Sequence, residues 1–367
     1  MYMKTVFHIV SHFDVGGAEQ VAANIASDTS GEVKCHVVEL IRAHGDYSQT
    51  FMQTLCEKGV ICHRGIVPDI RFHYLFERLA AFTFPLWFVF LFMKYRPAVI
   101  HSHTEMPDLA VFSFFKIFSS LTEGCKVVRT IDNTQLWTGM KGLGKVVERF
   151  FIKRNSNVAI SPSVRDNYYK EYGQYTPIIY NGVEKVVQKT FHSLENNKTN
   201  VLFAGRFEQQ KGIVHLVEII KRMESDTHYF FHIIGDGSLK DMISPLKSAS
   251  NVRIYPPLYG LASYLASFDY LLMPSEFEGL SILSIEASMS GLPVIANDCP
   301  GLKDTLPDNW VLKVHDNNIE QYMHIFKNVI PSLQYKSLSL QAQEFAEREF
   351  GINKMQEAYR AFYFNKV

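Results

Sequence analysis

Short runs of β-branched and apolar residues alternate with helix-length segments along this chain, and the series occurs twice. Such alternation is typical of a parallel sheet with crossover helices. At 367 residues the chain also exceeds the size at which one hydrophobic core usually stops growing. We therefore expect an α/β protein with two Rossmann-like, doubly wound parallel-sheet domains, the second with fewer strands. The expected strands are 5–10, 35–41, 98–101, 126–131 and 157–160, then 200–204, 229–234, 252–255, 270–273 and 293–296.

A polar stretch without periodicity separates the two series, and we expect it to be an interdomain linker at 184–199. The first domain then covers 1–183 and the second 200–340. A helix-patterned segment, 341–367, follows the last expected strand. Its pattern alone is compatible with packing on either domain.

Composition excludes several classes of protein. Lys and Arg together number 37, as do Asp and Glu, so the chain lacks the basic excess of a nucleic-acid-binding protein. Its five cysteines show no paired CxxC spacing, which argues against a zinc or dithiol site and favours a reducing compartment. The first residues run directly into an expected strand, without the pattern of an export signal. We expect a cytoplasmic protein.

The longest apolar stretch, Leu79–Met93, contains Pro85 and is shorter than the roughly 20 residues needed to cross a bilayer. We expect that it does not span a membrane. Its many aromatic residues fit a buried helix or a face that dips into a lipid interface, and burial is the favoured reading. The first half of the chain is slightly basic, which is compatible with contact to an anionic membrane.

Two candidate ligand-binding motifs follow expected strands of the first half. Gly16 and Gly17 lie between a strand and a helix, where backbone amides can face a phosphate or sugar, although a plain tight turn explains them equally well. His101 and His103 alternate at another strand end. We expect His103 to bind substrate and His101 to be structural. Two histidines alone do not make a metal site.

The second half contains the more specific motifs. Arg206 and Lys211 surround a turn at the end of the strand at 200–204, where two cations suit a diphosphate; a solvated loop is the alternative. Glu278 and Glu286 are separated by seven residues, and a helix starting near Ser281 would place Glu286 in its second turn. Carboxylates accept hydrogen bonds from sugar hydroxyls, and a helix N-terminus favours an anion. The alternative is a solvated acidic face.

In these motifs the chain resembles family 4 glycosyltransferases, retaining enzymes of the GT-B fold, many of which build capsule, exopolysaccharide, lipopolysaccharide or teichoic acid chains. The resemblance runs the length of the chain, and Arg206 with Lys211 and the Glu278–Glu286 pair are its most specific parts. It implies two domains facing a central cleft, with the C-terminal helical segment crossing back onto the N-terminal domain. The motifs that carry the resemblance are Gly16-Gly17-Ala18-Glu19, His101-Ser102-His103, Asn181-Gly182-Val183, Gly205-Arg206, Lys211-Gly212 and Glu278 with Glu286.

The resemblance also implies roles for individual residues. Arg206 and Lys211 would hold the donor diphosphate, Glu286 the ribose, and His103 would lie at the reactive face of the sugar. Glu278 would contact the transferred sugar, together with the backbone of Gly279, Leu280, Ser281 and Ile282; Gly16 and Gly17 would line the donor site. Neither a metal nor a cofactor is required by this scheme.

The function expected from this resemblance is transfer of a hexose or N-acetylhexosamine from a nucleotide sugar to a glycan or polyprenyl-linked acceptor. The residues 254–258 depart from the family's usual strand end near the base, so they do not identify the base. Uridine is expected on its frequency in the family alone, with guanosine second. Peripheral contact with the inner face of the cell membrane through the N-terminal domain is compatible with this function. The alternatives are an epimerase or hydrolase acting on sugar nucleotides and a non-catalytic sugar-nucleotide-binding subunit. A dehydrogenase is least favoured, because no GxGxxG follows either first strand.

Overall fold

The computed structural model describes residues 3–13, 16–44, 46–68 and 73–364. The chain forms two compact units. The first unit comprises residues 1–182 together with 352–367, and the second comprises 183–351. Each unit has its own sheet and its own hydrophobic core.

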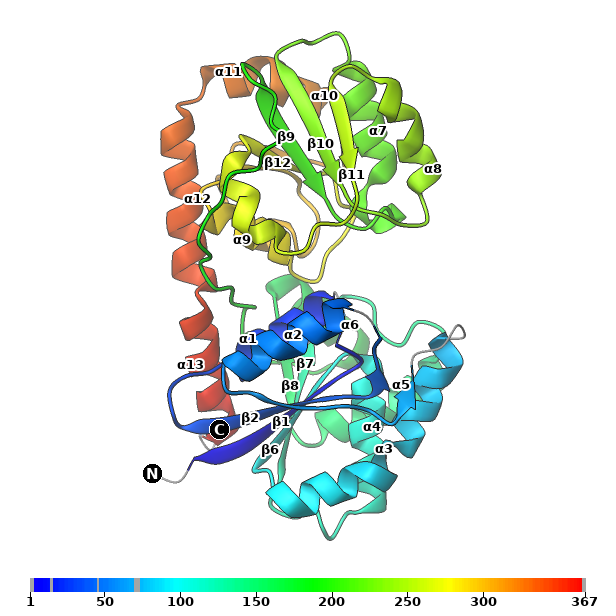
Figure 1. The fold of residues 1–367 in the computed structure, drawn as a ribbon. Helices are drawn as coiled ribbons and strands as arrows, with labels where there is room; N and C mark the ends of the chain where they lie inside the picture. Colours follow the sequence, from blue (N-terminus) through cyan, green and yellow to red (C-terminus); the bar gives the residue numbers. More distant parts are fainter. Residues whose placement is uncertain (1–2, 14–15, 45, 69–72, 365–367) are drawn as a thin grey trace. The chain divides into compact units, whose positions relative to one another are not determined.

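The first unit is built on a six-stranded sheet in the order β4-β2-β1-β6-β7-β8 (Figure 1). All neighbouring strands are parallel. The strand order reverses between β1 and β6, as in a doubly wound sheet. In chain order the strands are β1 (Lys4–Val10), β2 (Val33–Glu39), β4 (Ile61–His63), β6 (Val99–His103), β7 (Lys126–Ile131) and β8 (Asn157–Ala159), and β3 (Ile41–Arg42) pairs separately with β5 (Val67–Pro68).

Helices cover both faces of this sheet. Helix α3 packs against α4, and α4 against α5, so the three form one layer on one face (Figure 1). Helix α1 packs against α13, which brings the end of the chain to the first unit. The helices are α1 (Gly17–Ala26), α2 (Asp46–Glu57), α3 (His73–Tyr95), α4 (Glu105–Ile117), α5 (Lys141–Ile152), α6 (Pro162–Tyr172) and α13 (Ile352–Phe364).

The second unit repeats this architecture with the parallel order β11-β10-β9-β12-β13-β14. Both sheets have six strands, so the expectation of fewer strands in the second was wrong. The added strand, β14, has only two residues, which is too short to show a pattern. The strands are β9 (Thr199–Ala204), β10 (Tyr229–Ile234), β11 (Val252–Tyr255), β12 (Tyr270–Met273), β13 (Val294–Asn297) and β14 (Lys313–Val314).

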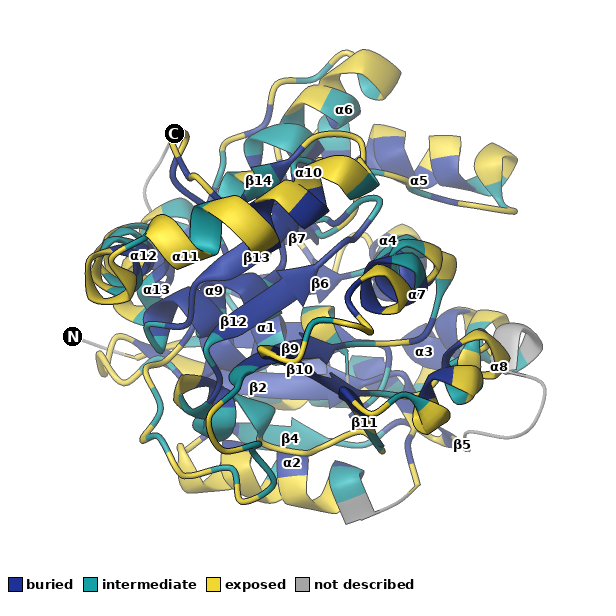
Figure 2. Ribbon diagram, turned by 90° about the horizontal axis from the view of Figure 1, so that it is seen from above, coloured by how far each residue is buried: buried dark blue, intermediate teal, exposed yellow. Residues whose placement is uncertain are grey.

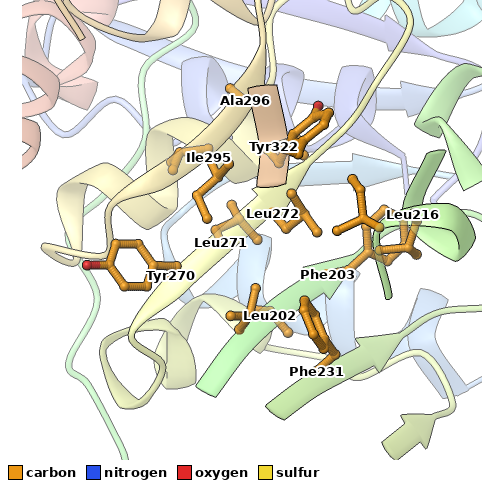
Figure 3. Close-up of a cluster of buried hydrophobic side chains, with 14 of the residues drawn as sticks. Leu202, Phe203, Leu216, Phe231, Tyr270, Leu271, Leu272, Ile295, Ala296 and Tyr322 are labelled. Carbon is orange, nitrogen blue, oxygen red and sulfur yellow. The ribbon is translucent and has the colours of Figure 1, made fainter. Parts of the chain in front are cut away.

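Apolar side chains of the central strands form the core of the second unit (Figure 3). Leu202, Leu271 and Leu272 are fully buried, and Tyr322 packs against the same strands. Figure 2 shows the central strands of both sheets as buried, the edge strand β4 as intermediate, and the outer faces of the helices as largely exposed. The main helices of this unit are α7 (Ile213–Arg222), α8 (Lys240–Ile243), α9 (Ile282–Met289), α10 (Ile319–His324), α11 (Ile330–Ser332) and α12 (Tyr335–Phe350).

The boundaries of the two units differ from the expected domain boundaries at the linker and at the C-terminal segment. Residues 184–199 contain no helix and, before Thr199, no strand, but they belong to the second unit. The segment 341–367 is split at Gly351. Its first part lies in α12, which packs on α9 in the second unit, and α13 packs in the first.

Helix α3 runs unbroken through Pro85, so the apolar stretch is longer than expected. It is the one helix in the described residues that is long and apolar enough, by length and composition, to cross a membrane. One stripe of α3, which includes Phe84, Phe88 and Phe92, is buried in the core of the first unit. This packing offsets the roughly 3 kcal/mol that an interior proline costs a helix. The buried stripe of α3 is therefore part of the hydrophobic core of the first unit.

Candidate functional site

In the second unit the strand order reverses between β9 and β12, which lie side by side at the centre of the sheet. An open α/β sheet binds ligands at the carboxyl ends of the strands at such a reversal, where the two following loops diverge. The loop after β9 carries Arg206 and Lys211, and the loop after β12 carries Glu278. The fold therefore places the two most specific sequence motifs at its expected binding edge.

Hydrogen bonds join these two loops. The Glu276 amide donates to the Gln210 carbonyl oxygen at 2.8 Å. The side-chain amide of Gln210 donates to the Phe277 carbonyl oxygen at 3.2 Å. Because Gln210 contributes both its backbone carbonyl and its side-chain amide to these bonds, the two loops are held in a fixed relation.

Lys211 and Glu278 form an ion pair across the two loops, with 2.7 Å between Nζ and Oε1. The Ser275 hydroxyl donates to the same carboxylate oxygen at 2.9 Å. Glu278 is 6% exposed, whereas the Lys211 side chain is 20% exposed and reaches solvent at the sheet edge. The expected neighbours Lys211 and Glu278 are thus brought together by direct contact.

Gly301 allows a third loop to close against Glu278. Its φ is 77°, and a Cβ there would lie 2.2 Å from the Glu278 carbonyl oxygen. The Glu278 amide donates to the Pro300 carbonyl oxygen at 2.9 Å. A side chain at position 301 would therefore displace the backbone that carries Glu278.

Arg206 lies on the same loop as Lys211 but has an exposed side chain. Among the residues that the structure describes, its guanidinium makes no hydrogen bond or ion pair. It is therefore available to an anionic ligand, and the solvated-loop reading remains open for this residue.

Helix α9 begins where the sequence predicted, at Ile282 with Ser281 as its N-cap. The Ser281 hydroxyl accepts from the Ser284 amide at 3.4 Å, which satisfies one of the free amides of the first turn. The backbone amides that precede the Ser284 amide at this helix start are the ones that an anion would meet. Gly279 and Leu280 join Glu278 to this helix, and Leu280 is buried.

Glu286 lies in the second turn of α9, as predicted, but its surroundings differ from those of Glu278. It lines a cavity of about 230 Å³ whose other walls include Gln188, Met289 and Gln343. Burial raises the pKa of Glu286 to about 7. The carboxyl group is therefore partly protonated at neutral pH, and a ligand that donates hydrogen bonds to it would favour the ionised form.

The first unit has the equivalent reversal between β1 and β6. Gly16 and Gly17 lie after β1, at the start of α1. A Cβ at Gly16 would lie 1.9 Å from the Glu19 carboxylate, whereas a Cβ at Gly17 would meet nothing within 4 Å. The atoms near Gly16 belong to the end of a flexible side chain, which can turn aside, so the local fold requires a glycine at neither position.

His103, at the end of β6, is 1% exposed and belongs to a buried histidine cluster. Its Nε2 lies 3.2 Å from Nδ1 of His8. His101 contacts Thr130 and Tyr363, at 2.7 Å through each ring nitrogen, so its structural role is confirmed. The ligand nitrogens of the three histidines lie within 4.8 Å of one another, but these hydrogen bonds already use several of them.

The histidine cluster is uncharged. Burial lowers the pKa of His8 to about 3 and holds the pKa values of His101 and His103 well below the ordinary range. Nδ1 of His103 has no hydrogen-bond partner among the described residues. Thr104, the next residue, has a φ of 72°, which is rare for a β-branched side chain and marks local strain at this strand end.

Asp132 is a candidate that sequence reasoning missed. It directly follows β7, and both of its carboxyl oxygens are shielded from solvent without a partner among the described residues. Burial, and then the nearby Glu19 carboxylate, raise the pKa of Asp132 well above its ordinary value. The sequence signal that could have identified Asp132 is its position directly after a strand of the parallel sheet.

A buried ion network supports this edge of the first unit. Arg129 bridges Asp108 and Glu148 at 2.6 and 2.7 Å, and all three side chains are 1% exposed. The Trp137 indole and the Tyr168 hydroxyl donate to Glu148 at 2.7 and 2.6 Å. Every partner lies within the first unit, so the network fixes the helices around β7.

Two protein-family models match the chain, one in each half. The model described as Glycosyltransferase Family 4 matches residues 15–185. The model described as Glycosyl transferases group 1 matches residues 198–330. Between them they include Gly16 and Gly17 and the loops after β6, β9 and β12.

The chain is similar to the capsular polysaccharide biosynthesis glycosyltransferase CapH of Staphylococcus aureus, with 23% identity over 388 aligned positions that cover 100% of both chains. It is also 26% identical, over 72% of its length and 78% of the relative's, to a 41.2 kDa protein from the cps region of Klebsiella pneumoniae. Among solved structures, HepE of Anabaena in complex with UDP and glucose superposes with a TM-score of 0.78 at 17% identity, covering 100% of each chain. At this identity the likeness shows the fold alone.

Proposed function

Because this chain belongs to the family 4 glycosyltransferases of the GT-B fold, we propose that it transfers a hexose or N-acetylhexosamine from a nucleotide sugar with retention of configuration. The acceptor is a glycan or a lipid-linked saccharide of cell-surface polysaccharide biosynthesis. The observation that carries the proposal is the Lys211–Glu278 pair, held at the central strand reversal of the second unit.

The donor is proposed to be a uridine diphosphate sugar. The structural neighbour HepE is described in complexes with UDP and with UDP-glucose, which supports this choice of base. Arg206 and Lys211 supply positive charge for a diphosphate, and the first amides of α9 supply donors. Glu286 supplies a carboxylate for the ribose hydroxyls.

In the proposed reaction the bond between the sugar C1 and the diphosphate oxygen breaks, and a bond between C1 and the acceptor oxygen forms on the same face. The acceptor proton passes to an oxygen of the departing diphosphate. Lys211 and Arg206 stabilise the negative charge that develops on that diphosphate. Glu278 accepts hydrogen bonds from the sugar, and the neutral His103 is assigned to the reactive face of the sugar. No metal ion or cofactor takes part in this scheme.

The first test is a thermal-shift and calorimetric screen of sugar nucleotides, followed by turnover of the matched donor. A ligand that binds the folded state raises the apparent melting temperature by mass action. The expected hit is one UDP-sugar, and Arg206→Ala and Glu286→Ala should each reduce its turnover by at least about tenfold. Wild-type turnover in both variants would refute the assigned roles.

Product analysis separates the remaining alternatives. Transfer with retention yields an acceptor-linked product with the anomeric configuration of the donor, measured by NMR. A hydrolase would release free sugar, and an epimerase would yield a new sugar nucleotide without acceptor. Unchanged turnover in excess EDTA is expected for a metal-independent reaction.

A further inference from the structure

The outward face of helix α3 carries an unusual row of apolar side chains. Leu79, Phe82, Leu86, Phe90 and Met93 follow a spacing of three and four residues, which places them on one stripe. They are 49, 56, 66, 67 and 48% exposed, respectively. We call these five residues the α3 ridge. It extends about 21 Å along the helix at 1.5 Å per residue.

The α3 ridge is not explained by packing inside the first unit. The opposite stripe of α3 includes Phe84, Phe88 and Phe92 and already fills the core. A core helix that faces water normally carries polar residues on its outer side. A contiguous exposed apolar surface of this kind marks a surface that binds something apolar.

Charge in the same helix layer identifies the kind of partner. Helices α3, α4 and α5 pack side by side on one face of the first sheet (Figure 1). No acidic side chain that the structure describes on these three helices is classed as exposed, because Asp108 and Glu148 are buried and Glu77 and Glu105 are half-buried. Glu123, in the turn after α4, is exposed. The exposed charged residues of the three helices are Arg78, Lys94, Lys116, Lys141, Lys145 and Arg149.

A shallow cavity between α4 and α5 concentrates this positive charge. It has a volume of about 170 Å³ and is lined by Lys116, Arg149, Lys153 and Arg154, together with two phenylalanines and a valine. Cations above an apolar floor suit a phosphate attached to hydrocarbon. A protein partner with a mixed polar surface would not require this combination.

We propose that the layer formed by α3, α4 and α5 docks on an anionic lipid bilayer. The α3 ridge enters the interface between headgroups and acyl chains, and the cavity between α4 and α5 binds a lipid phosphate. Apolar insertion and basic attraction are the two signals that stable peripheral binding requires. This deepens the proposed function and rests on it in one respect, since a lipid-linked acceptor would be presented at that surface.

The test is co-sedimentation of the full-length chain with vesicles. Phosphatidylcholine vesicles with about 30 mol % phosphatidylglycerol should bind it, and pure phosphatidylcholine vesicles should bind it at least about tenfold more weakly. A Leu86→Gln/Phe90→Gln variant should lose at least about tenfold in affinity for the anionic vesicles. A Lys145→Glu/Arg149→Glu variant should lose a similar factor at low salt and less at high salt, because salt screens exposed charges.

The matched control is Val214→Gln/Lys221→Glu, which changes one exposed apolar residue and one exposed cation on α7 of the second unit. It should bind vesicles like the wild type. Thermal melts check that all variants are folded. The proposal is overturned if the wild type does not bind anionic vesicles, or if the control variant loses as much affinity as the surface variants. It is also overturned if light scattering shows that the chain forms a dimer without lipid and that the Leu86→Gln/Phe90→Gln variant is a monomer.

Donor binding separates this inference from the proposed function. Calorimetry with the matched UDP-sugar should give the same affinity for the wild type and both surface variants. A chain that binds vesicles but no sugar nucleotide would leave the docking surface standing and refute the donor assignment. A chain that binds the donor but no vesicles would support the donor assignment and refute the docking surface.

Discussion

Lys211 and Glu278, 67 residues apart in the sequence, meet with 2.7 Å between the lysine Nζ and the carboxylate Oε1. They come from loops after neighbouring strands, β9 and β12, which lie on either side of the strand reversal in the second sheet. The contact holds a cation beside a buried acid before any donor is bound. A diphosphate that enters this edge would meet a lysine already positioned by its partner.

Replacing Lys211 by Ala should weaken both donor binding and folding. The change leaves the carboxylate of Glu278 buried with Ser275 as its one remaining side-chain donor among the described residues. Breaking a fully buried ion pair costs about 3–5 kcal/mol, whereas an exposed pair contributes about 1 kcal/mol or less. Because Lys211 is partly exposed, we expect a loss between these limits, about 1–3 kcal/mol in unfolding free energy. Urea unfolding measures this loss, and calorimetry measures the donor affinity. Lys211→Ala/Glu278→Gln should recover part of the stability and none of the affinity; recovery of both would contradict a role in binding.

Donor binding should depend on pH through Glu286. Burial raises its pKa to about 7 in the folded protein, so the folded state holds this proton up to higher pH than the unfolded state does. The contribution of Glu286 to stability is therefore complete below the ordinary glutamate pKa and is lost as pH rises through about 7. Ribose hydroxyls bind the ionised form, so donor affinity should rise over the same interval. Calorimetry between about pH 5.5 and 8.5 checks this, and Glu286→Gln should abolish the rise.

The two glycines after β1 should both accept alanine without a large loss of stability. A Cβ at Gly16 would meet only the flexible end of the Glu19 side chain, which can turn aside, so Gly16→Ala should change the melting temperature by no more than about a degree or two. Gly17→Ala meets open space and should leave stability within about 0.5 kcal/mol of the wild type. If Gly17 lines the donor site, Gly17→Ala should nevertheless reduce turnover. Unchanged turnover in a stable Gly17→Ala variant would remove this residue from the site.

Arg129→Met should destabilise the first unit severely. It leaves Asp108 and Glu148 buried without their common cation, and breaking such a network costs about 3–5 kcal/mol. Fluorescence of Trp137, which donates to Glu148, should report the loss during urea unfolding. Lys153→Met, at an exposed cation, is the matched control and should unfold like the wild type.

Most of the sheet architecture could be predicted from the sequence, because long apolar runs show their period. Strands 126–131, 229–234, 252–255 and 270–273 have the predicted bounds, and α9 starts at the predicted residue. The strand β14 has only two residues and is too short to show any pattern. A buried helix was the favoured reading of the stretch that contains Pro85, but its full extent was not predicted, because it depends on tertiary packing, which local propensity does not contain.

The positions of candidate site residues could be predicted where a motif follows a strand, but not where burial decides the surroundings of a side chain. The positions of Lys211 and Glu278 were predictable because parallel strands bring their carboxyl ends to one edge. That Glu286 lies in a separate cavity, and that Asp132 is buried without a partner, depend on side chains from distant segments. The assigned roles of His103, Arg206 and Ser281 remain predictions until a donor is bound.

Hydrogen–deuterium exchange with and without the matched UDP-sugar tests the central claim most directly. If the second unit holds the donor at its strand reversal, backbone amides of 205–212 and 274–286 should exchange more slowly in the complex. Helix α8, at Lys240–Ile243, should exchange at an unchanged rate. Protection confined to other segments, with 205–212 and 274–286 unaffected by a saturating donor, would contradict the account.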